Sequence, residues 1–419
     1  MTSEAIKDQD SVKDRVLMIY PSSDIPFLPP FEEFLRLSGF SAGMPGMIHD
    51  LGLQLGKVPP SDKTLKSAFT KPVTRSTANR IQDILAAKLP DNFDLLELSE
   101  KFKPWEDLKL RSNGASWFPA ILSLREFSLR DRFPNSRAER FIHDRITAEY
   151  DWLEEIKRIA LKPNQTKADK ALQEDAMKRL LHEHTFVDSD LIEIASTVRM
   201  SDPERPRIEQ QFWQDIRIEF YYSLLSNLSL DIMERFVELG IDSKGSDEMV
   251  SQGLMGSLAP KRKPDGQIFY PFAQLLDRWK SVFSEDPNEP LTWRELSKAI
   301  PHPSDQEIAK LDPKSKEYKD LWDIAMDTRK TRLKEWRSGV LPRDEQLLSF
   351  VENLLPENRD GHYSWLVAHL SLIWGRLIKQ EIHRYEAGGS LYDIDDGLLF
   401  RYEDIWKHYR DQAADILAT

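Results

Sequence analysis

Apolar residues recur at spacings of three and four along most of the chain, which is the period of an amphipathic helix. The clearest run lies at about 136–162, where spacings of three and four dominate among the apolar residues Phe141, Ile142, Ile146, Tyr150, Trp152, Leu153, Ile156 and Ile159. The same period predicts helices at 31–37, 167–185, 189–199, 206–226, 228–239, 271–284, 291–300, 315–338, 343–355, 362–386 and 401–418, with three short helices between 44 and 89. Only 267–270 has the pattern of a strand. The sequence therefore predicts an all-α, multi-helix fold.

Proline and glycine divide this helical pattern into segments. We expect an extended N-terminal arm at 1–30, a domain of short helices at 31–100 and an irregular connector at 101–135. A helical domain at 136–240, a loop-rich linker at 241–271 and a C-terminal helical domain at 272–419 would follow. The prediction is a small N-terminal subdomain joined to a large helical body, which suits a chain of 419 residues.

The composition excludes some kinds of chemical site and indicates where in the cell the protein is located. The chain has no cysteine, so disulfides, thiolate metal sites and cysteine nucleophiles are excluded. It has no run of about 18 apolar residues, and its first residues lack the basic-then-apolar layout of a signal peptide. We therefore expect a cytoplasmic protein without a membrane partner.

Charge is distributed unevenly. The net charge is −12, and residues 1–150 are balanced, so the remaining residues carry the whole excess of acid. Residues 57–88 form a local basic stretch in which Asp62 and Asp83 are the only acids. A protein that coats nucleic acid is usually basic overall. Any DNA contact here would therefore be made by a small patch, and the acidic body would contact protein.

The basic stretch has the order of a short helix, a connection and a second helix. Leu65, Ala68 and Phe69 would face a small core, and Gly56 would end the helix before them. Ser61 or Asp62 would cap the short basic helix, and Ser76 and Thr77 would cap the next one. The outward-facing residues would be Lys63, Thr64, Lys66 and Ser67, with Lys71 and Arg75 in the following loop.

Over residues 44–89 this order resembles lambda-repressor-like helix-turn-helix domains. The resemblance implies that the helix after Ser61 lies in the major groove of duplex DNA and that the six residues just named contact it. Pro59 and Pro60 make the turn longer and stiffer than is usual in such domains. The alternatives are that 44–89 is merely a small helical subdomain, or a protein-docking module with the same fold.

A second segment, 329–355, has a similar order. A basic helix with Leu333 as its apolar anchor precedes a tight turn and an amphipathic helix. Its candidate DNA-binding residues are Arg329, Lys330, Arg332, Lys334 and Arg337. The alternative is a solvated basic face that pairs with acidic neighbours.

A search for catalytic motifs assigns no catalytic residue, cofactor or metal. His182 and His184 are two residues apart, which on a helix directs them away from each other. The cluster Arg140, Asp144 and Arg145 is typical of surface ion pairs, and the HExxH, GxSxG and GxxxxGK patterns are absent.

These observations favour a non-enzymatic protein that binds duplex DNA locally and a protein partner through its acidic body. A subunit of a bacterial regulatory, mobile-element or antiviral defence complex fits that outline by analogy. Two alternatives stay open. One is a scaffold or adaptor without DNA contact, and the other is an enzyme whose site has no recognisable motif.

Overall fold

The computed structural model describes residues 15–16, 27–37, 43–68, 73–86, 117, 136–160, 162–198, 202–238, 251–253, 256, 258–284, 289–354, 362–388 and 397–414. Over these ranges the chain is mostly helical. Its strands there are two residues long and form two antiparallel pairs. The all-α prediction is confirmed.

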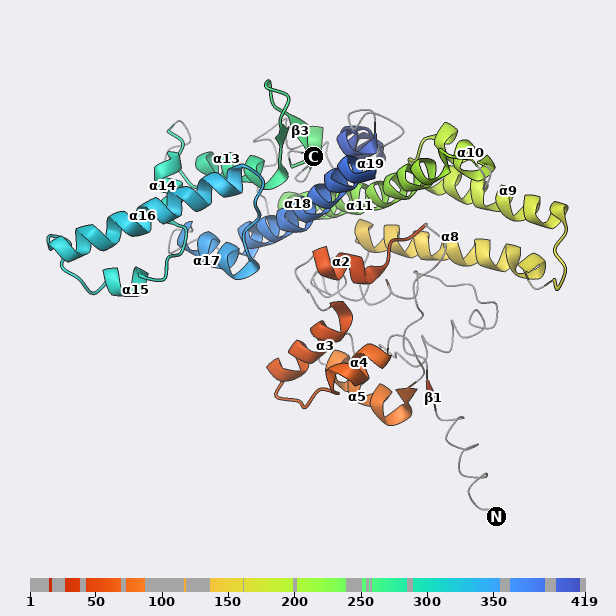
Figure 1. Ribbon diagram of the computed structural model, residues 1–419, viewed down its shortest axis with the longest axis horizontal. Helices are drawn as coiled ribbons and strands as arrows, with labels where there is room; N and C mark the ends of the chain where they lie inside the picture. Colours follow the sequence, from red (N-terminus) through yellow and green to blue (C-terminus); the bar gives the residue numbers. More distant parts are fainter. Residues whose placement is uncertain are drawn as a thin grey trace, which may run out of the picture.

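The helices form three regions (Figure 1). The N-terminal unit contains β1 (Arg15–Val16), α2 (Phe31–Leu37), α3 (Gly43–Gln54), α4 (Asp62–Ala68), β2 (Val73–Thr74) and α5 (Arg75–Ala86). The body contains α8 (Arg137–Ala160), α9 (Lys167–His184), α10 (Ser189–Thr197), α11 (Arg205–Glu238), α18 (His362–Gly388), the 3₁₀ turn η2 (Leu398–Phe400) and α19 (Tyr402–Gln412). The C-terminal arm contains β3 (Lys261–Arg262), β4 (Ile268–Phe269), α13 (Pro271–Val282), α14 (Trp293–Lys298), α15 (Asp305–Ile308), α16 (Lys316–Arg337) and α17 (Asp344–Leu354).

Most helices of the body and the arm begin and end within a few residues of their predicted bounds. The two helices expected at 206–226 and 228–239 are instead one helix, α11, of 34 residues. No proline or glycine lies between Ser223 and Leu230, so the backbone hydrogen bonds have no reason to stop there. The buried Asn227 donates from Nδ2 to the Ser223 carbonyl at 2.9 Å and stays within the helix.

α11 is also the surface on which the rest of the body packs. α8, α10 and α19 all lie against it, and α18 joins it to α13, α17 and α2. The last described helix, α19, therefore packs with the helices of the segment 136–240.

Large aromatic side chains fill the contacts around α11. Trp374 and Trp406 are completely buried, and the Trp374 ring lies 4.7 Å from that of Tyr222 on α11. Trp117 is also completely buried, and its indole N–H donates to the Pro29 carbonyl at 2.6 Å. Its ring lies 4.8 Å from that of Phe220, so this residue ties the segment before α2 to α11.

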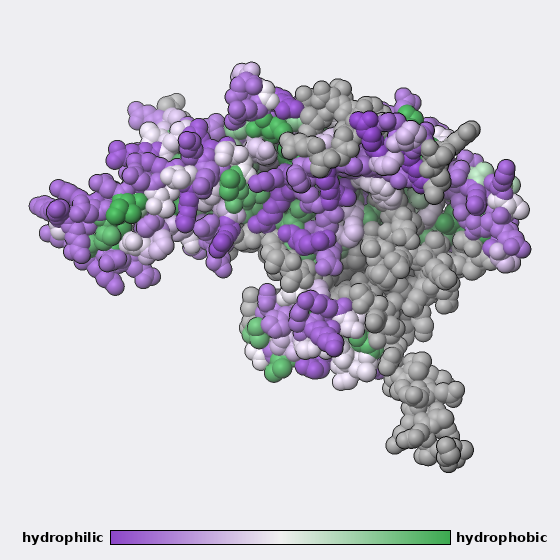
Figure 2. Space-filling model, in the orientation of Figure 1, coloured by the Kyte–Doolittle hydropathy of each residue, from purple (hydrophilic) through white to green (hydrophobic). Residues whose placement is uncertain are grey.

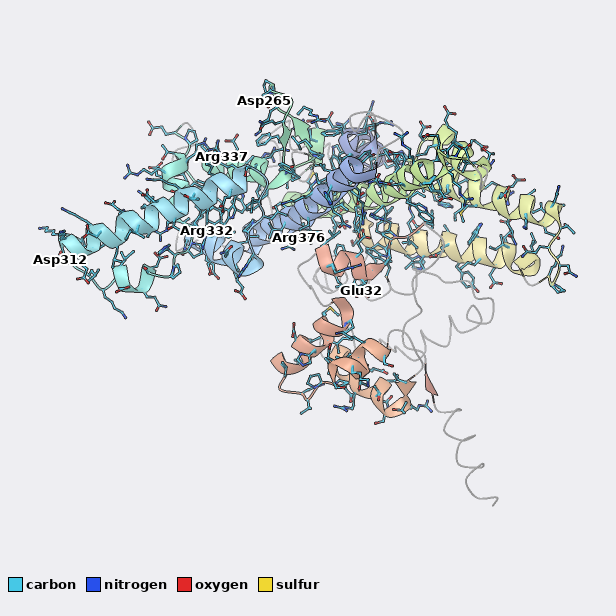
Figure 3. The ribbon with its side chains drawn as sticks, viewed as in Figure 1. Glu32, Asp265, Asp312, Arg332, Arg337 and Arg376 are labelled. Atoms are coloured by element: carbon cyan, nitrogen blue, oxygen red, sulfur yellow. The ribbon has the colours of Figure 1, made fainter. Side chains whose placement is uncertain are left out.

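Charged groups also attach the N-terminal unit to the body. Arg376 on α18 donates to the Leu37 carbonyl at the end of α2, at 2.6 Å (Figure 3 labels Arg376). Glu33 on α2 lies 3.2 Å from the guanidinium of Arg217 on α11, which also binds the buried Glu381 on α18 at 3.0 Å. Three helices from distant parts of the chain therefore share one buried ion-pair network.

The surface in the view of Figure 2 is mostly hydrophilic where the structure describes it, with small separate apolar areas. No helix in the described ranges is long and apolar enough to cross a membrane.

Candidate nucleic-acid interface and a basic cavity

α4 separates an apolar face from a basic one. Leu65 and Ala68 are completely buried, on a helix that packs against α3, whereas Lys63 and Lys66 are exposed, as the pattern predicted. Thr64 and Ser67 are half-buried. The Thr64 hydroxyl lies 2.8 Å from that of Ser61, so it is already engaged at the start of the helix.

The connection between α3 and α4 is built from local hydrogen bonds. Gly56 has a φ of 66°, a value that favours glycine, and the Lys57 N–H bonds back to the Gly52 carbonyl at 2.9 Å. The Thr64 N–H donates to the Ser61 hydroxyl at 3.3 Å, so Ser61 caps α4. Gly56 and Ser61 therefore have the roles predicted for them.

Leu53, near the end of α3, is apolar but 59% exposed. The start of α5 differs from the prediction. α5 begins at Arg75, and its first turn is capped by Thr74, whose hydroxyl accepts from the Thr77 N–H at 3.4 Å. Ser76 and Thr77 are thus inside the helix. The start moves forward because β2 pairs with β1, which holds Val73 and Thr74 in place immediately before the helix.

The basic groups of the unit differ in how they are engaged. Lys66 pairs with Asp62 at 2.8 Å, and Arg80 donates to the Val58 carbonyl at 3.0 Å. Lys63 and Arg75 are exposed, and the described part of the chain supplies no partner for either. The predicted residue Lys71 lies outside the described residues.

The basic segment on α16 corrects part of the prediction. Arg329 was expected on an exposed face, but it is only 4% exposed. Its Nε donates to the Ile300 carbonyl at 2.7 Å, and its Nη2 binds the carboxylate of Asp305 at the start of α15. Because α15 folds back on α16, this residue is enclosed and does not reach a nucleic acid.

The other four candidates on α16 lie nearer the surface. Lys330 and Lys334 are exposed, and Lys330 pairs with Asp327 at 3.2 Å. Arg332 is half-buried, with Nη1 3.4 Å from the Pro301 carbonyl. Arg337 is exposed, but its guanidinium lies 4.0 Å from the centre of the Trp293 ring on α14. The α16 residues are therefore dispersed and largely engaged with their own arm.

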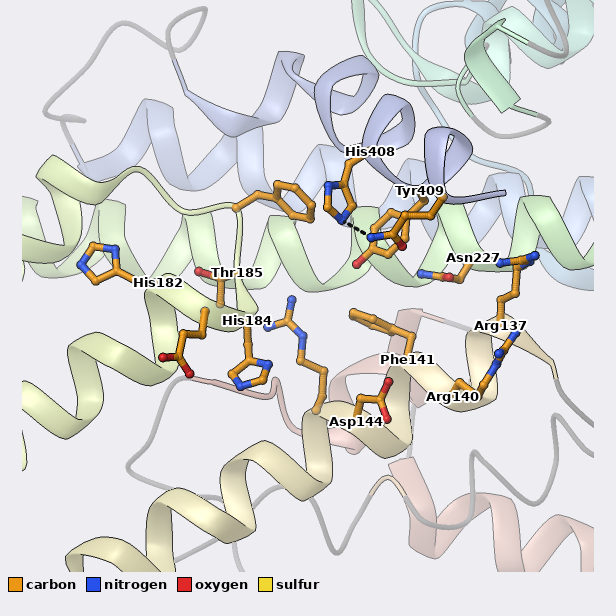
Figure 4. A pocket seen from close by; sticks show the side chains of 14 residues that line it. Arg137, Arg140, Phe141, Asp144, His182, His184, Thr185, Asn227, His408 and Tyr409 are labelled. Carbon is orange, nitrogen blue, oxygen red and sulfur yellow. Dashed lines mark hydrogen bonds between the residues drawn. The ribbon is translucent and has the colours of Figure 1, made fainter. Parts of the chain in front are cut away.

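A cavity of about 520 Å³ lies in the body, between α8, the end of α9, α11 and α19 (Figure 4). Its wall combines basic, aromatic and amide side chains, which include Arg137, Arg140, Phe141, Arg145, His182, His184, Phe186, Asn227, His408, Tyr409 and Gln412. Asp144 and Glu183 are the acidic residues of the lining. The sequence interpretation treated several of these residues as surface groups and did not predict that they meet.

Arg145 is the most enclosed cation of this cavity. It is 3% exposed, its Nη2 binds Glu219 of α11 at 2.5 Å, and its guanidinium lies over the rings of Phe27 and Phe141. Burial raises the pKa of Glu219, and the Arg145 charge offsets part of that effect. Burial, followed by the charge of Arg145, lowers the pKa of His184. His184 is therefore neutral at neutral pH and adds no positive charge.

Spacing on α8 is the one signal that pointed toward the cavity. Arg137, Arg140, Phe141, Asp144 and Arg145 recur at intervals of three and four, so they share one face. The opposite wall comes from residues far away in sequence, and helix periodicity carries no information about that pairing.

Within the described ranges, no three His, Asp or Glu side chains are grouped so that they could hold a metal ion. Comparison of the chain with protein-family models, curated proteins and solved structures finds no match. The function is therefore inferred from the residues and the geometry of the molecule itself.

Proposed function

We propose that this protein binds duplex DNA locally through α4 of the N-terminal unit, in the manner of a helix-turn-helix, and binds a protein partner through its acidic body. The observation that supports this is the two-sided character of α4. Leu65 and Ala68 hold the helix in a small core while Lys63 and Lys66 face solvent. The unit extends from one side of the body, so a duplex could approach α4 from outside (Figure 1).

Electrostatics support the same surface. Lys63 and Arg75 are exposed cations available to phosphate groups. Lys66 pairs with Asp62, but both side chains are more than half exposed, and such surface pairs contribute little to stability. A DNA phosphate would therefore compete for Lys66 at small cost. A cytoplasmic location and membership of a bacterial regulatory, mobile-element or defence complex belong to the same proposal.

Fluorescence anisotropy with a labelled DNA duplex tests the proposal. The wild-type protein should bind at about 50 mM salt and lose affinity steeply by about 200 mM, because bound phosphates release counterions. The double variant Lys63→Ala/Lys66→Ala should bind more weakly, with a salt slope smaller by about two. Lys167→Ala/Lys170→Ala on α9 is the matched control and should leave binding unchanged.

A second candidate function has its own observation. Leu53 at the end of α3 is 59% exposed and Val58 in the turn before α4 is 81% exposed. Apolar side chains in this position suit a protein-docking module. If the wild-type protein binds no duplex at low salt, and Leu53→Ser/Val58→Ser abolishes capture of a native partner, the docking role replaces DNA binding.

A further inference from the structure

The cavity between α8, α9, α11 and α19 lies in the body, on helices other than those that form the proposed DNA-binding unit. In Figure 4, Arg137, Arg140 and Asn227 gather on one side of it, and His182, His184 and Thr185 lie on the other. Phe141 and Tyr409 stand between these groups, on opposing helices. Two arginines therefore lie at one end of the cavity, and the aromatic side chains of Phe141 and Tyr409 follow next to them.

Two guanidinium groups on this wall have unused hydrogen-bond donors. Arg145 Nη1 and Arg137 Nε are buried and have no hydrogen-bond partner within the described structure. Buried donors are normally paired, because leaving one unpaired costs the free energy of its lost hydration. Arg145 is 97% buried, by its 3% exposure, so this cost applies to it in full. An acceptor-rich ligand in the cavity would supply the missing partners.

Among the residues that the structure describes, the carboxylates near these arginines leave some of the guanidinium hydrogen-bond donors unpaired. Glu219 binds Arg145 through Nη2. Asp231 lies close to Arg137, but its carboxylate accepts from the Ser136 hydroxyl and from the N–H groups of Arg137 and Ala138. That carboxylate occupies the N-terminus of α8. Asp144 pairs with His143 at 3.9 Å, and no described side chain pairs with Arg140.

The aromatic groups narrow the class of ligand. The rings of Phe141 and Tyr409 lie 6.3 Å apart and nearly perpendicular, and Phe186 packs against Tyr409 at 6.0 Å. Asn227 donates from Nδ2 to the Ser223 carbonyl, and its side chain is also hydrogen-bonded to Tyr409. Guanidinium groups suit phosphate, and an apolar aromatic wall suits a planar ring.

We propose that this cavity binds a mononucleotide, with the phosphate at Arg137 and Arg140 and the base along Phe141 and Tyr409. A volume of about 520 Å³ lies within the usual range for small-molecule sites. Arg140 makes the outer phosphate contact, and Arg145 contributes its unused Nη1 donor from the lining of the cavity.

Isothermal titration calorimetry with AMP, adenosine, ribose 5-phosphate and inorganic phosphate tests this assignment on the full-length protein. AMP should bind most tightly, because only AMP engages both the arginines and the aromatic wall. Arg140→Gln should weaken AMP binding by about tenfold to a hundredfold, the loss expected for a charge-assisted contact. Arg343→Ala, an exposed arginine on the C-terminal arm, is the control and should leave it unchanged.

Three results would overturn the proposal. The first is no heat with any of the four probes at millimolar concentration. The second is equal binding of AMP and adenosine with no effect of Arg140→Gln, which would mean that the phosphate is not recognised. The third is equal binding of AMP and inorganic phosphate, which would mean that the aromatic wall is not used. Circular dichroism and melting of Arg140→Gln should match wild type, because the side chain is exposed.

Discussion

At the scale of single residues, burial decides what a charged side chain does. Arg329 belongs to the densest basic run in the acidic half of the chain, yet it is enclosed by α15 and by the end of α14. Its neighbour Lys330 pairs with Asp327 in solvent. Two adjacent basic residues therefore have different physical roles, one in the stability of the arm and one in its surface charge.

Replacing Arg329 by Ala should lower the free energy of unfolding by about 2–3 kcal/mol, because the Ile300 carbonyl and Asp305 lose a charged donor. Lys330→Ala should change it by no more than about 0.5 kcal/mol. Urea denaturation followed by circular dichroism measures both. Equal, small effects would mean that Arg329 is a surface residue after all.

Asp215 on α11 couples stability to pH. It is 4% exposed, and burial raises its pKa to about 7, although hydrogen bonds from Gln211 and Tyr385 oppose this shift. In the unfolded chain it titrates near 3.8. Between about pH 4 and pH 7, Asp215 is therefore protonated in the folded protein and ionised in the unfolded chain. The resulting stabilisation is complete below about pH 4 and is lost as the pH rises to about 7.

The variant Asp215→Asn should remove this contribution to the pH dependence. In the wild-type protein, titration of Asp215 lowers the free energy of unfolding by about 2–4 kcal/mol between about pH 4 and pH 7. Denaturant titrations at a series of pH values, with Asp404→Asn on exposed α19 surface as the control, measure the difference. An unchanged slope in Asp215→Asn would show that Asp215 is ionised in the folded protein.

At the scale of elements, local rules account for most helix ends. Thr166 and Asp169 form a reciprocal capping box at the start of α9, and Thr292 and Glu295 form another at the start of α14. α16 ends at Arg337, and Gly339, two residues later, has a φ of 97° and lies against the ring of Tyr270. This glycine is required both by its backbone conformation and by the space around it.

Gly339→Ala should destabilise the protein by about 1–3 kcal/mol, because the new Cβ would lie 2.6 Å from Tyr270 Cδ2 in addition to the strained φ. Gly266 has a similar φ of 81° with no atom within 4 Å of a built Cβ, so Gly266→Ala isolates the cost of the backbone conformation alone. The difference between their melting temperatures measures the steric part. Equal melting temperatures would mean that Tyr270 moves aside freely.

At the scale of the whole molecule, long-range contacts hold distant segments together. α2 lies on α18, although more than 300 residues separate Leu37 from Arg376. Arg217 on α11 completes this junction by binding Glu33 and Glu381. The N-terminal unit, which carries the proposed DNA-binding surface, is thus attached to the body by buried charged groups.

Arg217→Ala should cost about 3 kcal/mol and speed hydrogen exchange in α2, because Glu33 and the fully buried Glu381 lose a shared cation. Arg205→Ala removes a more exposed pair with Glu209 on the same helix and should cost about 1 kcal/mol or less. Unfolding by urea and exchange mass spectrometry give the two readouts. Unchanged exchange in α2 would mean that apolar contacts alone hold the junction.

The sequence by itself determined the helical class, most helix bounds and the two-sided character of α4. These follow from interactions between residues three or four apart, from caps and from glycine, all of which are local. The short strand at Ile268–Phe269 was likewise predicted from its own residues. The continuity of α11 was missed, because two helices were expected at 206–226 and 228–239 although no helix-breaking residue lies between them.

Only the tertiary structure decided which charged groups are buried and which side chains meet. Arg329 is covered by α15, the β1–β2 pair moves the start of α5, and α19 returns to pack on α11. The cavity exists because α8 and α19 face each other across α11, which brings Arg140 and Tyr409 together over a separation of 269 residues. Such contacts depend on how whole helices pack, and packing is set by the shape and total burial of many side chains rather than by any local pattern.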